Sequence, residues 1–398
     1  MVKIVTGMRR CGKSYLLFSL LRKYLIDSGV DDWHIISIDL ESIYNERLRE
    51  PLAILEYISQ RMVDGGDYYV LIDEIQLLSR FEEVLNTLLK NPQVDVYVTG
   101  SNARFLSKDV ITTFRGRGDE VRVHPLSFAE YMSGRTNAQF MEASLNEYML
   151  LGGLPQLLSM NTERQKKEYL RMLYANTYLI DIKERYGIRY DDDLEELVDV
   201  IASSIGSFTN PQKIANTFRS AKQSRLSRDT VKVYLDHLQD AFMVERSVRY
   251  DIKGRRYIDT PAKYYFEDLG LRNARLNFRQ TEPTHLMENL IYNELRLRGY
   301  SVDVGQVVLN ARNAQGVSER RNLEVDFVCN KGYDRVYVQS AFAMPTAEKR
   351  EQEFASLRHI GDSFLKVVIV AGMQPTYRND DGILVLNIFD FLLNRVAL

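Results

Sequence analysis

Eight residues near the start of the chain have the types and spacing of a phosphate-binding loop. They fit the pattern G-x-x-x-x-G-K-[ST] and read Gly7-Met8-Arg9-Arg10-Cys11-Gly12-Lys13-Ser14. In such a loop, backbone N–H groups surround the phosphates and the following helix adds partial positive charge. Lys13 can reach the β- and γ-phosphates, and the Ser14 hydroxyl can ligate Mg²⁺. We expect ATP and Mg²⁺ as cofactors, contacted by Gly7, Arg9, Arg10, Cys11, Gly12, Lys13, Ser14 and Tyr15.

A strand and a helix must position this loop, and the sequence predicts both. Residues 2–6 form a short apolar segment before the loop, and residues 15–21 are predominantly apolar and predict a helix after it. The alternative is a chance match to a loose pattern. The order strand, loop, helix favours the nucleotide site, because it places the helix N-terminus at the phosphates.

A second strand ends in two adjacent carboxylates. Residues 68–72 are apolar apart from two tyrosine hydroxyls, and Asp73 and Glu74 follow them. Ligands bind at the carboxyl ends of buried parallel strands, so Asp73 is predicted to hold Mg²⁺ and Glu74 to polarise the attacking water. The alternative is an ordinary strand terminus.

Three further polar residues are candidates for the same site. Asn102 follows the predicted strand 94–100, with Ser101 between them, and either side chain could contact the γ-phosphate or the lytic water; the alternative is a helix cap. Arg115 and Arg117 could stabilise phosphoryl charge, with Arg117 slightly preferred. Such an arginine is often supplied by a neighbouring subunit, which would make the protein a homo-oligomer. The alternative is a solvated loop.

The composition limits the other classes of function. The chain has 398 residues, 45% of them hydrophobic and 27% charged, with a net charge of −2, so a nucleic-acid surface would have to be a local basic patch. Its two cysteines have no metal or disulfide spacing. No apolar run approaches the roughly 20 residues needed to span a membrane. With the loop starting at residue 7, no signal peptide is expected, and we predict a cytoplasmic protein.

Several motifs together resemble one group of AAA+ ATPases, the prokaryotic ATPases that carry a C-terminal domain of unknown function. The motifs are the loop at 7–14, Leu71-Ile72-Asp73-Glu74-Ile75-Gln76, Val98-Thr99-Gly100-Ser101-Asn102, Arg115-Gly116-Arg117 and Pro125-Leu126-Ser127-Phe128-Ala129-Glu130-Tyr131. The resemblance runs nearly end to end. It implies an ATP-hydrolysing α/β domain with a parallel sheet, followed by a helical subdomain that covers the nucleotide as a lid. Residues 137–186 have a helical pattern, interrupted by Gly152-Gly153-Leu154-Pro155.

The middle of the chain has the element order of a winged helix. Three predicted helices, the third capped by Ser227, precede two strand-like runs at 244–250 and 262–266. Six basic residues and one acid lie between positions 213 and 232, and the turn between the strands is also basic. We expect contact with double-stranded DNA through Arg225, Arg228, Lys232, Arg255 and Arg256. The alternative is a module that contacts protein.

The last third of the chain resembles the restriction-endonuclease-like fold with parts missing. Glu288 would be the helix acid and Asp326 the metal-binding acid. Gln339 stands where a carboxylate is expected, and Ala341 where a lysine is expected. Because Mg²⁺-dependent cleavage needs anionic ligands and usually a lysine, we predict an inactive domain. Lys331 or Lys349 could fill the gap, which leaves nuclease activity as the alternative.

These observations combine into one predicted architecture. It consists of a P-loop AAA+ domain (1–134), a helical lid (135–190), a winged-helix domain (191–272) and an α/β restriction-endonuclease-like domain (273–398). The predicted function is an ATPase that couples Mg-ATP binding and hydrolysis to rearrangement of the later modules. Two alternatives stay open: a DNA-binding protein with a latent nuclease regulated by ATP, and a nucleotide-binding scaffold with little hydrolysis.

Overall fold

The computed structural model describes residues 1–101, 118–134, 140–188, 191–222, 226–312, 318–396 and 398. The chain divides into two compact units, Met1–Pro125 with Asp240–Phe242, and Leu126–Gln239 with Met243–Leu398. None of the described helices combines the length and apolar character needed to cross a membrane.

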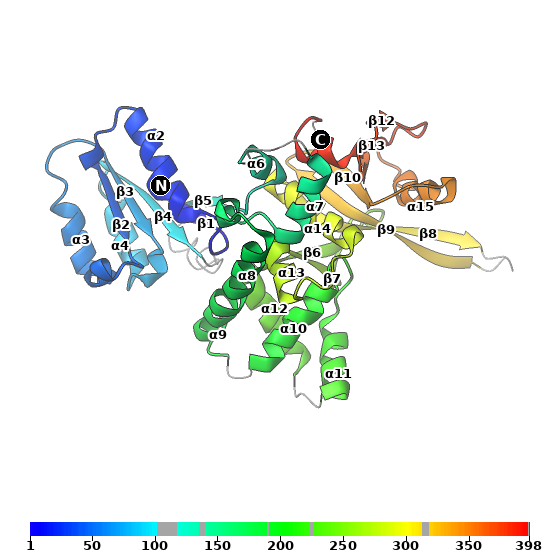
Figure 1. The fold of residues 1–398 in the computed structure, drawn as a ribbon, viewed down its shortest axis with the longest axis horizontal. Coiled ribbons are helices and arrows are strands. Elements are labelled where there is room, and N and C mark those ends of the chain that lie inside the picture. Colours follow the sequence, from blue (N-terminus) through cyan, green and yellow to red (C-terminus); the bar gives the residue numbers. More distant parts are fainter. Residues whose placement is uncertain (102–117, 135–139, 189–190, 223–225, 313–317, 397) are drawn as a thin grey trace. The chain divides into compact units, whose positions relative to one another are not determined.

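A five-stranded parallel sheet forms the centre of the first unit (Figure 1). Its spatial order is β2-β3-β4-β1-β5, and every neighbouring pair runs parallel. The three central strands are mostly buried and rich in valine, isoleucine and leucine, as expected for a parallel sheet covered on both faces. The strands are β1 (Val2–Thr6), β2 (Ile35–Asp39), β3 (Tyr68–Asp73), β4 (Val94–Gly100) and β5 (Gly118–Arg122).

Helices cover both faces of this sheet. Figure 1 shows α2 (Arg22–Asp27) on one side and α3 (Pro51–Ser59) and α4 (Phe81–Leu88) on the other. The helix after the loop begins as α1 (Lys13–Tyr15) and continues through a π-helical segment (Leu16–Leu21) into α2. Short 3₁₀ segments lie at Asp32–His34, Ile43–Arg49 and Ile75–Leu77.

The second unit is built on an eight-stranded mixed sheet of order β12-β13-β11-β10-β9-β8-β6-β7. The hairpin of β6 and β7, predicted as the wing of a separate domain, belongs to this sheet because β6 pairs in parallel with β8, Arg249 lying opposite Val304. The sheet therefore runs across the boundary predicted between residues 272 and 273. The strands are β6 (Val244–Asp251), β7 (Arg256–Phe266), β8 (Ser301–Arg312), β9 (Ser318–Lys331), β10 (Asp334–Ala341), β11 (Leu365–Val370), β12 (Tyr377–Arg378) and β13 (Leu384–Asn387).

The segment predicted as a lid lies within this second unit. Tyr148 of α7 shares one apolar core with Phe128 of α6, Leu290 of α14 and Phe389 of α16, so these helices pack with the C-terminal sheet. Their action as a lid stays a prediction. The helices are α6 (Phe128–Ser133), α7 (Met141–Leu151), α8 (Glu163–Leu173), α9 (Ile180–Tyr186), α10 (Asp191–Ser203), α11 (Pro211–Lys222), α12 (Arg228–Asp240), α13 (Leu269–Arg275), α14 (Pro283–Leu297), α15 (Ala347–Arg358) and α16 (Ile388–Leu392), with a 3₁₀ segment at Pro155–Ser159 and a π-helical one at Tyr174–Leu179.

The Gly152-Gly153 pair has a packing role in this unit. Asp268 caps α13 by accepting the Leu271 N–H at 2.9 Å, and its other oxygen accepts the Gly153 N–H at 2.8 Å. A Cβ on Gly152 would lie 2.3 Å from the nearer Asp268 oxygen, and the φ of Gly152 is +78°. Glycine is required here because the backbone passes directly over a buried carboxylate. Burial raises the pKa of Asp268 to about 6.

Candidate nucleotide-binding site

The loop from Gly7 to Ser14 leaves the carboxyl end of β1 in a backbone conformation that needs glycine at both ends. Gly7 has a φ of +142° and Gly12 a φ of +106°. A Cβ on Gly7 would lie 2.1 Å from the carbonyl oxygen of Val123, so the loop is pressed against the chain that follows β5. Cys11 supports this contact, because its buried thiol donates to the same carbonyl at 3.4 Å.

Lys13 and Ser14 stand at the start of the helix that follows. Lys13 is 4% exposed, and its Nζ donates to the carbonyl oxygen of Met8 at 2.9 Å, across the loop. The Ser14 hydroxyl lies close enough to the carboxylate of Asp73 to lower its pKa. The structure therefore brings together the two side chains that were predicted, from segments far apart in the sequence, to hold Mg²⁺.

Asp73 ends β3, and the neighbouring strand β4 orients it. The Thr99 hydroxyl donates to Asp73 Oδ1, and its oxygen accepts the backbone N–H of Glu74 at 2.9 Å. Burial raises the pKa of Asp73, the hydrogen bonds from Thr99 and Ser14 oppose that rise, and the nearby charges of Glu74 and Asp39 add to it. A cation bound beside a buried carboxylate with other negative charges nearby stabilises the ionised form of that carboxylate.

Glu74 lies beside Asp73 in a left-handed backbone conformation, with a φ of +49°. The residue is 7% exposed. Its carboxylate accepts hydrogen bonds from the Ser101 hydroxyl at 3.2 Å and from the Gln76 side-chain amide. Ser101 was named in the sequence beside Asn102 as a polar contact, and it reaches Glu74. Thr99 and Gln76 were missed; the available signal for Thr99 was a hydroxyl inside an otherwise apolar strand.

The remaining predicted contacts lie at the rim of the loop or outside the described residues. Arg9 pairs with Glu41 at 3.8 Å. Arg10 is exposed, with a φ of +63°, and Tyr15 is 64% exposed. Asn102, Arg115 and Arg117 fall in the segment 102–117, which the structure does not describe.

The donor set suits Mg²⁺ bound together with a nucleotide. Mg²⁺ keeps several waters and is commonly held by one or two side chains plus substrate phosphates, and Ser14 with Asp73 provides that number. A closed, all-protein metal cage would need more ligands, and within the described ranges no group of three or more His, Cys, Asp or Glu side chains is arranged to hold a metal.

The residues predicted to form a nuclease-like site lie close together in the second unit. The backbone N–H of Asp326 on β9 donates to the Gln339 side-chain oxygen at 3.3 Å, and Asp326 Oδ2 accepts the Ser340 N–H at 2.8 Å. Lys263 of β7 contacts the neighbouring Glu288 on α14, its Nζ donating to Oε1 at 2.9 Å. Burial and the charge of Glu288 raise the pKa of Asp326, and Lys263 opposes the rise. Sequence reasoning missed Lys263.

The two lysines named as substitutes for the missing one have other partners. Lys331 donates to the Arg298 carbonyl at 2.8 Å. Lys349 pairs with Glu353 at 2.7 Å within α15, and Ala341 is buried in the core. Gln339 lies 3.5 Å from that same Glu353.

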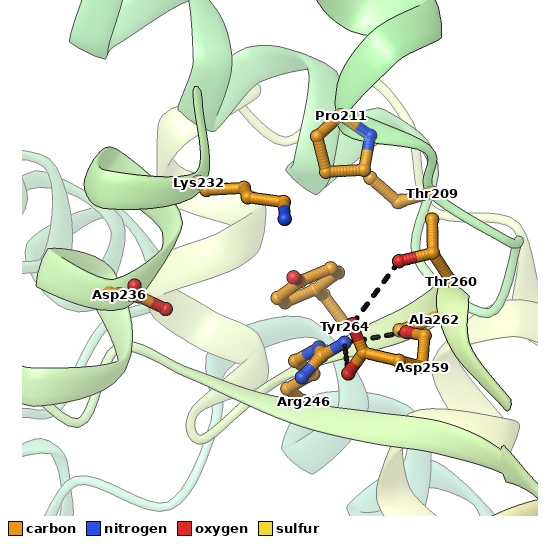
Figure 2. A pocket seen from close by; sticks show the side chains of 9 residues that line it. All are labelled: Thr209, Pro211, Lys232, Asp236, Arg246, Asp259, Thr260, Ala262 and Tyr264. Atoms are coloured by element: carbon orange, nitrogen blue, oxygen red, sulfur yellow. Dashed lines mark hydrogen bonds and ion pairs between the residues drawn. The ribbon is translucent and has the colours of Figure 1, made fainter. Parts of the chain in front are cut away.

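The predicted DNA contacts are spread over α12 and the β6–β7 turn. Arg228 and Arg255 are exposed, Arg256 pairs with Asp251 at 3.5 Å, and Arg225 falls outside the described residues. Lys232 lines a cavity of about 200 Å³, which Figure 2 shows with Arg246 reaching in from β6. Arg246 is tied to Asp259 by a contact of 2.6 Å. The lining residues are Thr209, Pro211, Lys232, Asp236, Arg246, Asp259, Thr260, Ala262 and Tyr264.

Comparison with known proteins finds two domain families along the chain. Residues 1–132 match a family described as an AAA domain, and residues 142–282 match a domain of unknown function, DUF8612. An uncharacterised protein of Haemophilus influenzae is 32% identical over 98% of this chain and 94% of its own length. The uncharacterised protein MJ1544 of Methanocaldococcus jannaschii is 26% identical over 96% of this chain and 83% of its own length.

A solved structure is similar at a greater distance. The Walker-type ATPase PABY2304 of Pyrococcus abyssi aligns with 69% of this chain and 91% of its own, at 16% identity and a TM-score of 0.46. No functional inference follows from a likeness at that level. The identity to the Haemophilus protein along nearly the whole length of both chains is the stronger finding. The chain therefore belongs to the same family as that protein, and its first 132 residues match the AAA domain family.

Proposed function

We propose that the chain binds ATP with Mg²⁺ and hydrolyses it. The observation that carries this proposal is that Thr99 fixes the acid pair that ends β3: its hydroxyl donates to Asp73, its oxygen accepts the Glu74 N–H, and the Ser14 hydroxyl of the loop lies close enough to lower the pKa of Asp73. Ser14 and Asp73 would hold Mg²⁺, which would neutralise negative charge on the β- and γ-phosphates. Lys13 would exchange its contact with the Met8 carbonyl for phosphate oxygens.

Glu74 is proposed to orient and polarise the attacking water. Its carboxylate adjoins the metal-binding acid and is fixed by Ser101 from the intervening strand β4. A carboxylate fixed in this orientation can accept a proton from a water molecule placed beside it. Asn102 and one arginine, either Arg115 or Arg117, would complete the site. That arginine would come from a neighbouring subunit.

The test compares Lys13→Ala with the unaltered protein. Removing the ammonium is expected to abolish Mg²⁺-dependent ATP turnover, because the phosphates lose the cation of the loop. Phosphate release and nucleotide binding are measured separately, with Lys23→Ala, an exposed lysine of α2, as the matched control. Turnover in Lys13→Ala equal to that of the control would contradict the assignment of the loop.

Hydrolysis is proposed to drive rearrangement of the second unit, with double-stranded DNA as its candidate ligand. One observation favours a winged helix there: Thr209, between α10 and α11, forms an isolated antiparallel bridge with Ala262 of β7, so the three-helix segment is tied to the hairpin. The Ser227 hydroxyl caps α12 by accepting the Thr230 N–H at 3.1 Å. Arg228 and Arg255 are exposed on this segment.

Duplex binding should weaken steeply with salt if these cations contact phosphates. Changing both Arg228 and Arg255 to Ala should reduce the slope of log K against log [salt] by about two, since each phosphate contact contributes about 0.9. An unchanged slope, or duplex binding that does not respond to salt, would exclude this surface. Intact DNA after incubation with Mg²⁺ and ATP is expected, because the nuclease-like site is predicted to be inactive.

A further inference from the structure

A lysine is buried among three carboxylates inside the second unit. Lys263 of β7 is 2% exposed. Its Nζ lies 2.9 Å from an oxygen of Glu288 on α14 and 2.6 Å from an oxygen of Glu324 on β9. Asp326 lies two residues beyond Glu324 on the same strand, so both side chains extend from the same face of the sheet. The ammonium thus joins a helix to two strands.

The carboxylates of this cluster need a cation. Glu288 and Asp326 are each 8% exposed, and an uncompensated charge at such depth is strongly destabilising. The Tyr265 hydroxyl donates to Glu288 at 2.7 Å, which satisfies one lone pair but supplies no charge. Among the described residues, Lys263 is the cation that the contacts place in this cluster.

The contact distances around Nζ are close to those of a metal shell. Oxygen ligands surround Ca²⁺ at about 2.3–2.6 Å, so a cation at the Nζ position would need only a small contraction of Glu288 and Glu324. Glu324 also lines a hollow of about 80 Å³ together with Gln306, which is 9% exposed and whose side-chain oxygen has no partner within the described residues. This hollow has room for several waters or a hydrated ion beside the cluster.

We propose that the ammonium group of Lys263 is a built-in replacement for a divalent cation, and that it closes the carboxylate site of the second unit to metal. In this arrangement the carboxylates stabilise the folded unit by pairing with the covalently attached ammonium group, and they do not bind an exchangeable metal ion. This inference is independent of ATP hydrolysis, because the nucleotide site lies in the first unit.

The experiment uses the full chain without nucleotide and Mn²⁺ as the probe, with free Mn²⁺ measured by electron paramagnetic resonance. The unaltered protein and Lys331→Met, a change to an exposed lysine outside the cluster, are expected to bind no Mn²⁺ at this site. Lys263→Met is expected to gain one site. At roughly 10–100 times its Kd, Mn²⁺ should raise the unfolding midpoint of this variant by about 2–5 °C. Lys263→Met with Asp326→Asn should lose that gain.

Lys263→Gln provides a second variant if the methionine does not fold, because its amide keeps a donor for one carboxylate. Circular dichroism checks that each variant is folded. A site for Mn²⁺ in the unaltered protein that Asp326→Asn removes would overturn the proposal, since Lys263 would then share the cluster with a metal. Folded Lys263 variants that bind no Mn²⁺ would overturn it equally.

Discussion

Replacing Glu74 with Gln tests the proposed chemistry with little change in shape. The glutamine side chain has nearly the same volume as glutamate. Its amide oxygen can accept a hydrogen bond from the Ser101 hydroxyl, which lies 3.2 Å from the Glu74 carboxylate in the unaltered chain. We therefore expect a stability change within about 1 kcal/mol, the net value of one hydrogen bond. The charge of Glu74 raises the pKa of Asp73, so its removal should leave Asp73 more fully ionised and Mg-ATP binding undiminished.

The rate should fall far more than the stability. Positioned acid–base catalysis contributes about 10²–10⁴ in rate, equivalent to about 2.7–5.4 kcal/mol at 1.36 kcal/mol per decade. We therefore expect nucleotide binding to be unchanged or tighter while turnover falls at least tenfold. Phosphate release under saturating Mg-ATP measures turnover, and a fluorescent ATP analogue measures binding.

Glu83→Gln is the matched control for this prediction. Glu83 is exposed on α4 and pairs with Arg80, so it changes the same charge away from the site. Turnover of Glu74→Gln within threefold of that control would remove Glu74 from the mechanism. A parallel loss of binding and turnover would instead indicate that Glu74 holds the nucleotide or the loop.

Two further predictions concern the contacts that organise each unit. Thr99→Val removes the hydroxyl that donates to Asp73 and accepts the Glu74 N–H, so it should lower the free energy of unfolding by about 1–3 kcal/mol and turnover about tenfold. Chemical denaturation measures the first and phosphate release the second. Values equal to those of the unaltered protein in both assays would show that Thr99 does not organise the acid pair. Gly152→Ala should cost roughly 2–4 kcal/mol, because its backbone conformation is nearly confined to glycine and its Cβ would meet Asp268. Gly361→Ala, which has open space around it, should stay within about 0.5 kcal/mol, and equal denaturation midpoints for the two variants would refute the packing argument.

Most elements around the candidate site were predictable because their patterns are local. The apolar strands 2–6, 68–73 and 94–100 and the helix after the loop lie where the sequence indicated. The contact of Ser14 with Asp73 could be anticipated only through the rule that parallel strands share a carboxyl edge. The strand order was not predictable in the same way, because β4 enters between β1 and β3 from a later part of the chain.

Unit boundaries in the later part of the chain were harder to infer. The order of three helices and a hairpin lies where it was predicted, but β6 also pairs with β8, a strand that the sequence patterns did not indicate. Strand β8 carries few of the usual signals at its start, with Asp303 and Gly305 among its first residues. Sheet membership depends on hydrogen bonds to a distant segment, which no local pattern records.

By itself the sequence determined the chemistry of the loop, since eight consecutive residues from Gly7 to Ser14 specify both the backbone turns and the cation that phosphates require. It also indicated where the predicted nuclease-like site departs from its pattern, at Gln339 and Ala341. Only the tertiary structure decided that Thr99 orients the acid pair and that Lys263 neutralises Glu288 and Glu324. Both are contacts between side chains distant in sequence, and their energies depend on burial and on separations of a few ångströms, which arise only when the strands assemble.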